Sequence, residues 1–202
     1  MRPMHLAPTP MHPSPSRPLA VTVVVASTRE GRFGPVVARW VADHAEARPD
    51  LDVTMADLLD ADLPAVMPSG PHPAVVAWTE VVAAADAFIV VTPEYNHSFP
   101  ASLKQAIDLV GAEWRAKPVA LVSYGGMSGG LRAVEHLRPV FSEVRATTVR
   151  DTISFHGAGA CFDEAGRPRD RAGTDAAAKV LLDELTWWGR ALRSAREADL
   201  AA

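Results

Sequence analysis

Cysteine is almost absent from this chain of 202 residues, because Cys161 is the only one. A single cysteine cannot form an internal disulfide, and it has no neighbouring thiolate with which to share a metal ion. The sequence therefore excludes a fold stapled by disulfides and favours a reducing compartment, so we expect a cytoplasmic protein. The histidines do not cluster at the spacing of metal ligands either, and no metal site is predicted.

Long hydrophobic runs and blocks of one charge sign are also missing. No apolar stretch approaches the roughly 20 residues that a membrane-spanning helix needs, so no membrane partner is expected. Acidic and basic residues are interspersed and the net charge is −4, which gives no indication of a nucleic-acid partner. With 48% hydrophobic residues at this length, the sequence predicts one domain with a sizeable core.

The beginning of the chain differs in composition from the rest. Six prolines fall within the first 18 residues, and no continuous apolar stretch accompanies them. Because proline lacks a backbone donor, this segment cannot form a helix or an internal strand ladder. We predict a disordered arm over residues 1–18, without the features of a secretory signal, and a single domain over residues 19–198.

Hydrophobic runs of strand length recur along this domain. Three are almost wholly apolar, as strands of a parallel sheet are when both faces are covered: Ala20–Ala26, Phe88–Thr92 and Val119–Tyr124. Leu51–Met55 and Arg145–Asp151 are weaker candidates. A helical period follows each run. This alternation of strand and helix predicts an α/β fold in which helices cover both faces of a parallel sheet.

Three loops that follow predicted strands have unusual sequences. In an open parallel sheet, ligands bind outside the carboxyl ends of the strands, where the strand order reverses. The first loop, residues 27–34, leads into a helix N-terminus, where free N–H groups and the helix dipole favour an anion. With Arg29, Arg32 and two hydroxyls it suits one terminal phosphate, and it contains neither the dinucleotide fingerprint nor a P-loop. A solvated surface turn is the alternative.

The other two loops suit a flat ligand. The second loop, residues 93–100, is pinned by a proline at each end and could hold a planar heterocycle, or be only a closed turn. The third loop, residues 124–130, has four glycines, which permit close contact with a ligand or simply a flexible connection. Neither H-E-x-x-H nor G-x-S-x-G occurs, so the sequence lacks the signatures of a zinc protease and of an α/β-hydrolase.

Taken in order, the segments ASTREGRFG, TPEYNHSFPASLKQAID and KPVALVSYGGMSGGLRAVEHLRP resemble the NADPH-dependent FMN reductase family over about residues 20–151. The resemblance implies a flavodoxin-like sheet of five strands in the order 2-1-3-4-5. It also implies bound FMN, NADPH or NADH as hydride donor, a small-molecule acceptor such as a flavin or quinone, and a homodimer or tetramer. Because the flavin carries the chemistry, no catalytic side chain is predicted.

The same resemblance assigns the residues that bind the cofactor. It places Ser27, Arg29, Arg32, Phe33 and Gly34 around the phosphate, Pro93, Glu94, Tyr95 and Asn96 along the isoalloxazine ring, and Tyr124, Gly125 and Gly126 at the other edge of the ring. The first loop departs from the family pattern S-x-R-x-x-S-x-N, because Arg32 replaces the second serine and Gly34 replaces the asparagine. We expect Arg32 to compensate through a charge-assisted bond to the phosphate.

Other functions stay open at this point. A quinone, azo-dye or metal-oxyanion reductase would use the same site with a different acceptor. A flavodoxin-type electron carrier would bind FMN without turnover, although such carriers usually have a hydroxyl-rich phosphate loop and an acidic face. A flavodoxin-like protein that has lost FMN and serves only in interaction is a further alternative. For self-association, we expect an apolar surface that includes Phe99, Trp114 and Met67.

Overall fold

A parallel β-sheet forms the centre of the molecule in the computed structural model, which describes residues 17–201. Five strands lie in the order β2-β1-β3-β4-β5, and every neighbouring pair is parallel. They are β1 (Leu19–Val25), β2 (Leu51–Asp57), β3 (Ala87–Pro93), β4 (Pro118–Gly125) and β5 (Thr147–His156). The predicted fold class and strand order are confirmed. Only β5 differs clearly in extent, since it continues to His156.

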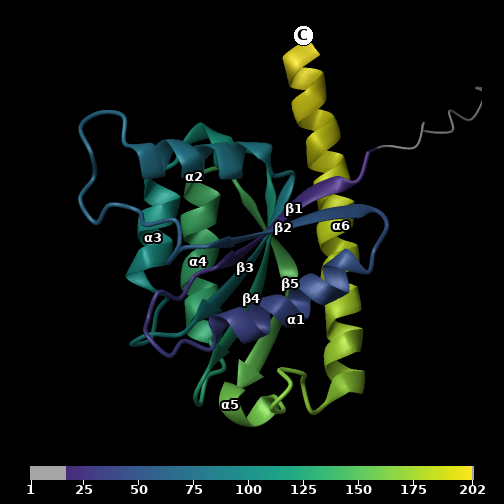
Figure 1. The fold of residues 1–202 in the computed structure, drawn as a ribbon. Helices are drawn as coiled ribbons and strands as arrows, with labels where there is room; N and C mark the ends of the chain where they lie inside the picture. Colours follow the sequence, from purple (N-terminus) through teal and green to yellow (C-terminus); the bar gives the residue numbers. More distant parts are fainter. Residues whose placement is uncertain (1–16, 202) are drawn as a thin grey trace, which may run out of the picture.

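Helices cover both faces of this sheet (Figure 1). On one face lie α1 (Gly34–Glu46), α5 (Ala158–Cys161) and α6 (Arg171–Ala201). The other face is covered by α2 (Pro73–Ala84), α3 (Ala101–Asp108), the 3₁₀ helix η1 (Ala112–Trp114) and α4 (Leu131–Glu143). The sequence analysis missed α5 and η1, because a single turn is too short to show a helical period.

Alternate side chains of the central strands enter two separate cores. Val23 and Ile89 belong to the core beneath α1 and α6, whereas Val24 and Val90 belong to the core beneath α2, α3 and α4. All four are almost completely buried, and each contributes about 1.5–3 kcal/mol to folding. Burial on both faces is the physical reason why β1, β3 and β4 have nearly continuous apolar sequences.

A buried carboxylate, Asp86, ties the amino ends of the strands to the last helix. It directly precedes β3, and its side chain is 5% exposed. Asp86 accepts hydrogen bonds from the backbone N–H of Ala20 and from the guanidinium groups of Arg17, Arg193 and Arg196. Burial alone would raise the pKa of Asp86, but these donors outweigh it and hold the pKa below its ordinary value.

The same cluster holds the start of the described chain. Residues 1–16, most of the predicted arm, lie outside the described residues. Arg17 and Pro18 were assigned to that arm, yet their carbonyl oxygens accept hydrogen bonds from Arg193. The sequence did not reveal this attachment, because Arg193 lies 176 residues from Arg17 along the chain.

Replacing Asp86 with asparagine should lower the free energy of unfolding by about 3–5 kcal/mol, because it leaves buried arginines without their counter-charge. Urea denaturation at neutral pH measures this difference. Since the folded pKa of Asp86 lies below the unfolded value of about 3.9, its contribution is complete above that pH and is lost as the pH falls through the folded value. The difference in the free energy of unfolding between wild type and variant should therefore become smaller at acidic pH.

The matched control for this substitution is Asp199→Asn. Asp199 forms an ion pair with Arg115 in which both side chains are more than half exposed. Such a pair contributes less than about 1 kcal/mol. Equal losses in the two variants would contradict the role given to Asp86.

Candidate functional site

The three unusual loops meet at the carboxyl ends of β1, β3 and β4. These strands are neighbours in the sheet, and contacts join the loops to one another. The hydroxyl groups of Ser27 and Tyr95 lie 2.7 Å apart, and the backbone N–H of Glu94 donates to the carbonyl oxygen of Tyr124 at 3.1 Å. Strand β1 lies between β2 and β3, so the residues predicted from the sequence gather at the point where the strand order reverses.

Backbone N–H groups of the first loop are available to a ligand. Within the part of the chain that the structure describes, none of those from residues 27 to 34 donates a hydrogen bond. Helix α1 follows directly, with proline in its first turn and no side-chain cap. Unpaired N–H groups at a helix N-terminus, together with the helix dipole, favour an anion. Gly31 has a left-handed φ of 63°, which turns the loop at little cost.

The two arginines of this loop have different surroundings. The guanidinium of Arg32 donates to the carbonyl oxygen of Ser27 at 2.8 Å and forms an ion pair with Asp57 at the end of β2. Its hydrogen bond to Asp57 raises the pKa of Arg32. Arg29 is exposed and, within residues 17–201, its side chain forms no hydrogen bond or ion pair. Arg32 therefore braces the loop, and Arg29 is the arginine that remains available to an anion.

Tyr124 places its hydroxyl beneath the first loop. The side chain is part of the core under α1 and contacts Phe33 edge to face, with ring centroids 6.3 Å apart. Its hydroxyl oxygen is buried, and no hydrogen bond of ordinary length and angle reaches it from the described residues, although the Ser27 hydroxyl lies close enough to lower the pKa of Tyr124. Burial raises the pKa of Tyr124 to about 12, so the group is a proton donor at neutral pH. The resemblance places Tyr124 at the edge of the flavin ring. Because its side chain is buried under α1, only its backbone is available at that edge.

The second loop forms a strained, tight turn. Tyr95 and Ser98 exchange two backbone hydrogen bonds, at 2.8 and 3.0 Å. Between them, Asn96 and His97 both have left-handed φ values, of 49° and 72°, as in a type I′ turn. Asparagine adopts this conformation readily, whereas a non-glycine residue such as histidine does so at a cost of about 1–3 kcal/mol. The structure thus fixes the direction of both residues at the tip of the loop.

An ion pair joins the second loop to the third. The carboxylate of Glu94, which is 8% exposed, accepts hydrogen bonds from the backbone N–H of Arg132 at 3.2 Å and from its guanidinium at 2.9 Å. Arg132 lies in the first turn of α4, immediately after the third loop. Neither Arg132 nor Asp57 could be predicted from the sequence, because each lies in a different strand-to-helix connection from the residue with which it pairs.

The glycines that the third loop requires are not those singled out from the sequence. Gly129 and Gly130 have left-handed φ values of 62° and 91°. A Cβ at Gly129 would lie 2.5 Å from the hydroxyl oxygen of Ser154, and one at Gly130 would lie 2.6 Å from the Cβ of Ser123. Gly126 has open space around it instead, so its backbone can be approached by a ligand.

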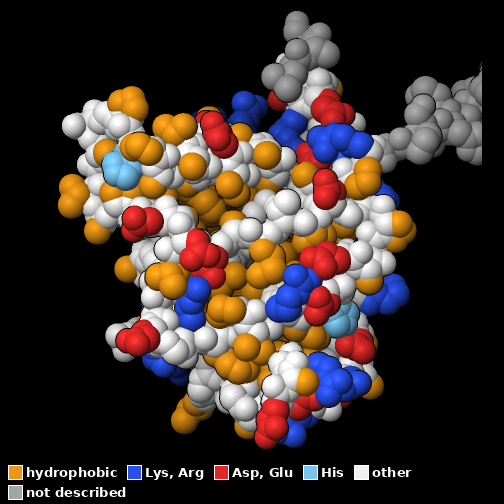
Figure 2. All heavy atoms as spheres, in the orientation of Figure 1, with side chains coloured by type: hydrophobic (Ala, Val, Ile, Leu, Met, Phe, Trp, Pro, Cys, Tyr) orange, Lys and Arg blue, Asp and Glu red, His pale blue; other side chains and the backbone are white. Residues whose placement is uncertain are grey.

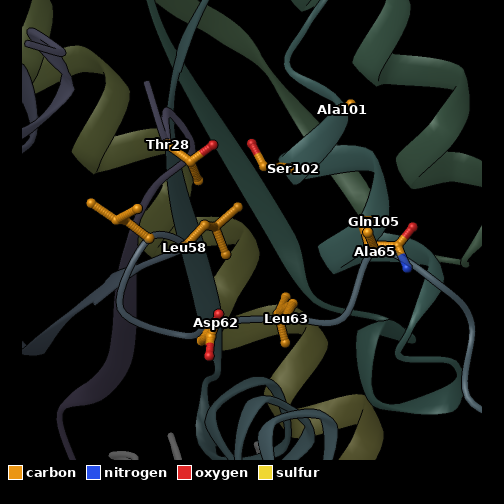
Figure 3. A pocket seen from close by; sticks show the side chains of 9 residues that line it. Thr28, Leu58, Asp62, Leu63, Ala65, Ala101, Ser102 and Gln105 are labelled. Atoms are coloured by element: carbon orange, nitrogen blue, oxygen red, sulfur yellow. The ribbon is translucent and has the colours of Figure 1, made fainter. Parts of the chain in front are cut away.

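A separate pocket of about 360 Å³ lies between the first loop, the loop after β2 and the start of α3. In Figure 3, Thr28 and Ser102 face each other across it, and Leu58 and Leu63 form its apolar wall. Leu58 belongs to the core under α2 and α3, whereas Tyr124 belongs to the core on the opposite face. The pocket is therefore distinct from the floor of the first loop. Its lining comes from three segments, so no single sequence motif could reveal it.

The described residues offer neither a metal site nor a membrane-spanning helix. Between residues 17 and 201, no group of three or more histidine, cysteine or acidic side chains is arranged to hold a metal ion. Across the same residues, no helix has the length and apolar character needed to span a bilayer. The thiol of Cys161 donates to the carbonyl oxygen of His156 at 3.0 Å.

Replacing Glu94 with glutamine should lower the free energy of unfolding by about 1–3 kcal/mol and speed amide exchange in the second loop. The reason is that the ion pair between Glu94 and Arg132, which joins the second loop to α4, loses its negative charge. Burial alone would raise the pKa of Glu94, but hydrogen bonds from Ser128 and Arg132 outweigh it and lower the pKa. The stabilisation is therefore present above the unfolded pKa of about 4.3 and is lost as the pH falls through the folded value. Denaturation and hydrogen exchange at several pH values measure it.

Glu135→Gln is the control, since the Glu135 carboxylate is 72% exposed and pairs with Arg138 on the same helix. Its substitution should change stability by no more than about 0.5 kcal/mol. Faster exchange in the second loop of this control would argue against a specific brace at Glu94.

Comparison with known proteins gives a consistent result. The family model described as NADPH-dependent FMN reductase matches residues 19–160. An NAD(P)H-dependent FMN reductase of Schizosaccharomyces pombe is 36% identical over 121 residues, which cover 54% of this chain and 60% of that protein. The chain therefore matches less than two thirds of the length of that relative. A quinone reductase of Pseudomonas putida is 30% identical over 182 residues, covering 86% of this chain and 96% of that protein.

A solved structure supports the fold independently. FerB, a flavoenzyme NAD(P)H:(acceptor) oxidoreductase from Paracoccus denitrificans, matches with a TM-score of 0.68 at 22% identity, covering 85% of this chain and 97% of its own. At that identity the similarity bears on architecture. Because the family model covers well over half of the sequence, and a relative matches along almost its whole length, the chain belongs to the NADPH-dependent FMN reductase family.

Proposed function

We propose that this protein is an FMN-binding, NAD(P)H-dependent oxidoreductase that passes reducing equivalents to a small acceptor such as a flavin or a quinone. One observation carries the proposal: in the described structure the backbone N–H groups of the first loop donate no hydrogen bond, and they lead into the N-terminus of α1 at the point where the strand order reverses. Family membership supports it, as do the printed names of the relatives, one an FMN reductase and another a quinone reductase.

The residues present fit a cofactor that ends in a single phosphate. Backbone N–H groups and the guanidinium of Arg29 are donors only, and phosphate oxygens are acceptors. Gly34 keeps the floor of the loop open to the Tyr124 hydroxyl, because a Cβ there would lie 2.9 Å from that oxygen. Two donor-bearing loops beside this floor suit a flat ring system. Since no pyrophosphate fingerprint exists, the fit is to FMN rather than FAD.

Bound FMN would supply the redox chemistry, taking a hydride from the nicotinamide and passing electrons to the acceptor. The chain itself binds and orients. The first loop fixes the phosphate end, with Arg29 and the N–H groups as donors. The strained turn at Asn96 and His97, braced through Glu94, presents its backbone to one side of the ring, and Gly125 and Gly126 border the other. We propose no catalytic side chain, in keeping with binding residues that act through the backbone.

We further propose a cytoplasmic homodimer. The single cysteine supports a reducing compartment. An apolar surface supports self-association: Figure 2 shows hydrophobic side chains gathered over the loop after β2 and over α2, where Leu59, Val66, Met67 and Val76 are 48%, 79%, 56% and 47% exposed. Trp114, expected on this surface, is instead 1% exposed and belongs to the core. An isologous dimer is the commonest way to cover such a patch.

The purified protein should be yellow, and mass spectrometry of the extracted cofactor should identify FMN. The holoenzyme should then oxidise NADPH or NADH in the presence of a benzoquinone or free flavin, followed as loss of nicotinamide absorbance. Apoprotein prepared from the same batch is the control, and added FMN should restore its activity. Recovery of FAD would refute the cofactor assignment, and a flavin that NAD(P)H does not reduce would identify an electron carrier instead.

Sedimentation at micromolar concentration should show a dimer or tetramer. Val66→Asp combined with Met67→Asp should shift the protein toward monomer, because charges would have to be buried in the interface. Val180→Asp, at an exposed position on α6 that is 52% accessible, is the control and should leave the assembly unchanged. A monomeric wild type would contradict the proposal.

A further inference from the structure

The Tyr124 hydroxyl has no function in the packing of the protein itself. The ring of Tyr124 packs in the core with Phe33, a role that phenylalanine would fill equally well. Its oxygen is buried and lacks a partner among the described residues, and burial of an unpaired hydroxyl is destabilising. Buried polar groups in native proteins are nearly always paired. The Nδ1 of His72 and the Nε1 of Trp114 also lack partners among the described residues, but of these three groups the Tyr124 hydroxyl is the one that lies against the first loop.

The hydroxyl points to the place where the first loop enters α1. A Cβ added at Gly34 would meet the Tyr124 oxygen at 2.9 Å and the Val25 side chain at 3.2 Å. The Tyr124 hydroxyl thus occupies space that a side chain at position 34 would need. Gly34 is also the position where the family pattern has asparagine. Glycine and tyrosine therefore form a complementary pair that brings a donor to this point from the strand below.

The groups around the Tyr124 hydroxyl show what a ligand would contact at this point. Ser27 and Tyr95 hydrogen-bond to each other at 2.7 Å, and the Ser27 hydroxyl also lies close enough to the Tyr124 oxygen to lower the pKa of Tyr124. The N–H groups of residues 27–34 donate no bond in the described structure, and Arg29 and Arg32 lie close enough to favour negative charge at the phenol. These N–H groups and the Arg29 guanidinium can only donate, and phosphate oxygens can only accept.

We infer that the Tyr124 hydroxyl donates a hydrogen bond to the phosphate of FMN, and that Gly34 is what admits it. The inference rests on the proposed FMN-binding function and adds to it a residue that distinguishes the phosphate from the rest of the flavin. The first loop encloses the hydroxyl, so contact requires the loop to shift outward. Gly31, with no atom within 4 Å of an added Cβ, lies in its open part.

Flavin binding to apoprotein tests this inference. Dissociation constants of FMN and riboflavin are measured by quenching of flavin fluorescence, in wild type and in Tyr124→Phe. FMN should bind about tenfold to a hundredfold more weakly to the variant, the loss for one hydrogen bond to a charged group. Riboflavin lacks the phosphate, so its affinity should stay within about twofold of wild type. The Tm of the apoprotein should be unchanged or higher, because the removed hydroxyl had no partner.

Two companion variants make the result specific. Gly34→Ala should lower the apoprotein Tm, and it should do so less in the Tyr124→Phe background, because one of the atoms it meets is then gone. Thr186→Val removes a buried hydroxyl that bonds within α6, so it should lower the Tm and leave the ratio of FMN to riboflavin affinity unchanged.

The outcomes separate this inference from the function on which it rests. If wild-type apoprotein binds neither flavin, the proposed function fails and the inference with it. If wild type binds FMN and the affinity ratio is the same in Tyr124→Phe, only the inference fails. A lower apoprotein Tm in Tyr124→Phe, with equal losses for both flavins, would assign the hydroxyl a structural role and would also overturn it.

Discussion

Parallel pairing of β1 between β2 and β3 is the constraint on which the rest of this structure depends. Parallel strands must be joined by crossovers, and here these place helices on both faces and bury the central strands completely. The same geometry brings the carboxyl ends of β1, β3 and β4 to one edge. Each strand there passes into a loop and then a helix N-terminus, where the first N–H groups lack intrahelical partners, and in the first loop none of the described N–H groups donates a hydrogen bond. The capacity to bind an anion thus follows from the topology before any side chain is considered.

The two edges of the sheet differ in whether their polar groups find hydrogen-bond partners within the chain. At the amino edge most are satisfied within the chain, although the Nε1 of Trp114 has no partner among the described residues. Asp86 meets three arginines, and the ammonium of Lys117 donates to the carbonyl oxygens of Val82 and Ala83 at the end of α2. Burial, with a smaller effect from the nearby Arg196 charge, lowers the pKa of Lys117 to about 8, and the charges of Asp86 and Glu113 offset this only in part. At the carboxyl edge, the N–H groups of the first loop donate no hydrogen bond to any described residue. The amino edge therefore stabilises the fold, and the carboxyl edge retains donors for a ligand.

Sequence patterns anticipated the elements of the site but not the pairing of its side chains. Strands that are buried on both faces have nearly continuous apolar sequences. The central strands and the loops after them could therefore be located in the sequence. The alternation along β4 also carried an unused signal, since Ala120, Val122 and Tyr124 share one face. That period would have turned Tyr124 toward α1 rather than toward the ring. The pairing of Arg32 with Asp57 left no such signal, because it depends on how two separate loops come together.

The first loop contains both a charged donor and neutral donors. Arg32 is committed to Asp57, so within residues 17–201 Arg29 is the arginine of this loop without an ion pair, beside N–H groups and hydroxyls. Neutral donors of this kind do not titrate near neutral pH, and the pKa of Tyr124, raised to about 12, keeps that hydroxyl protonated as well. A phosphate monoester loses its second proton near pH 6. In a site built in this way, the pH dependence of FMN affinity around neutrality would come from the ligand, whose dianion offers three acceptor oxygens to a set of donors that does not change.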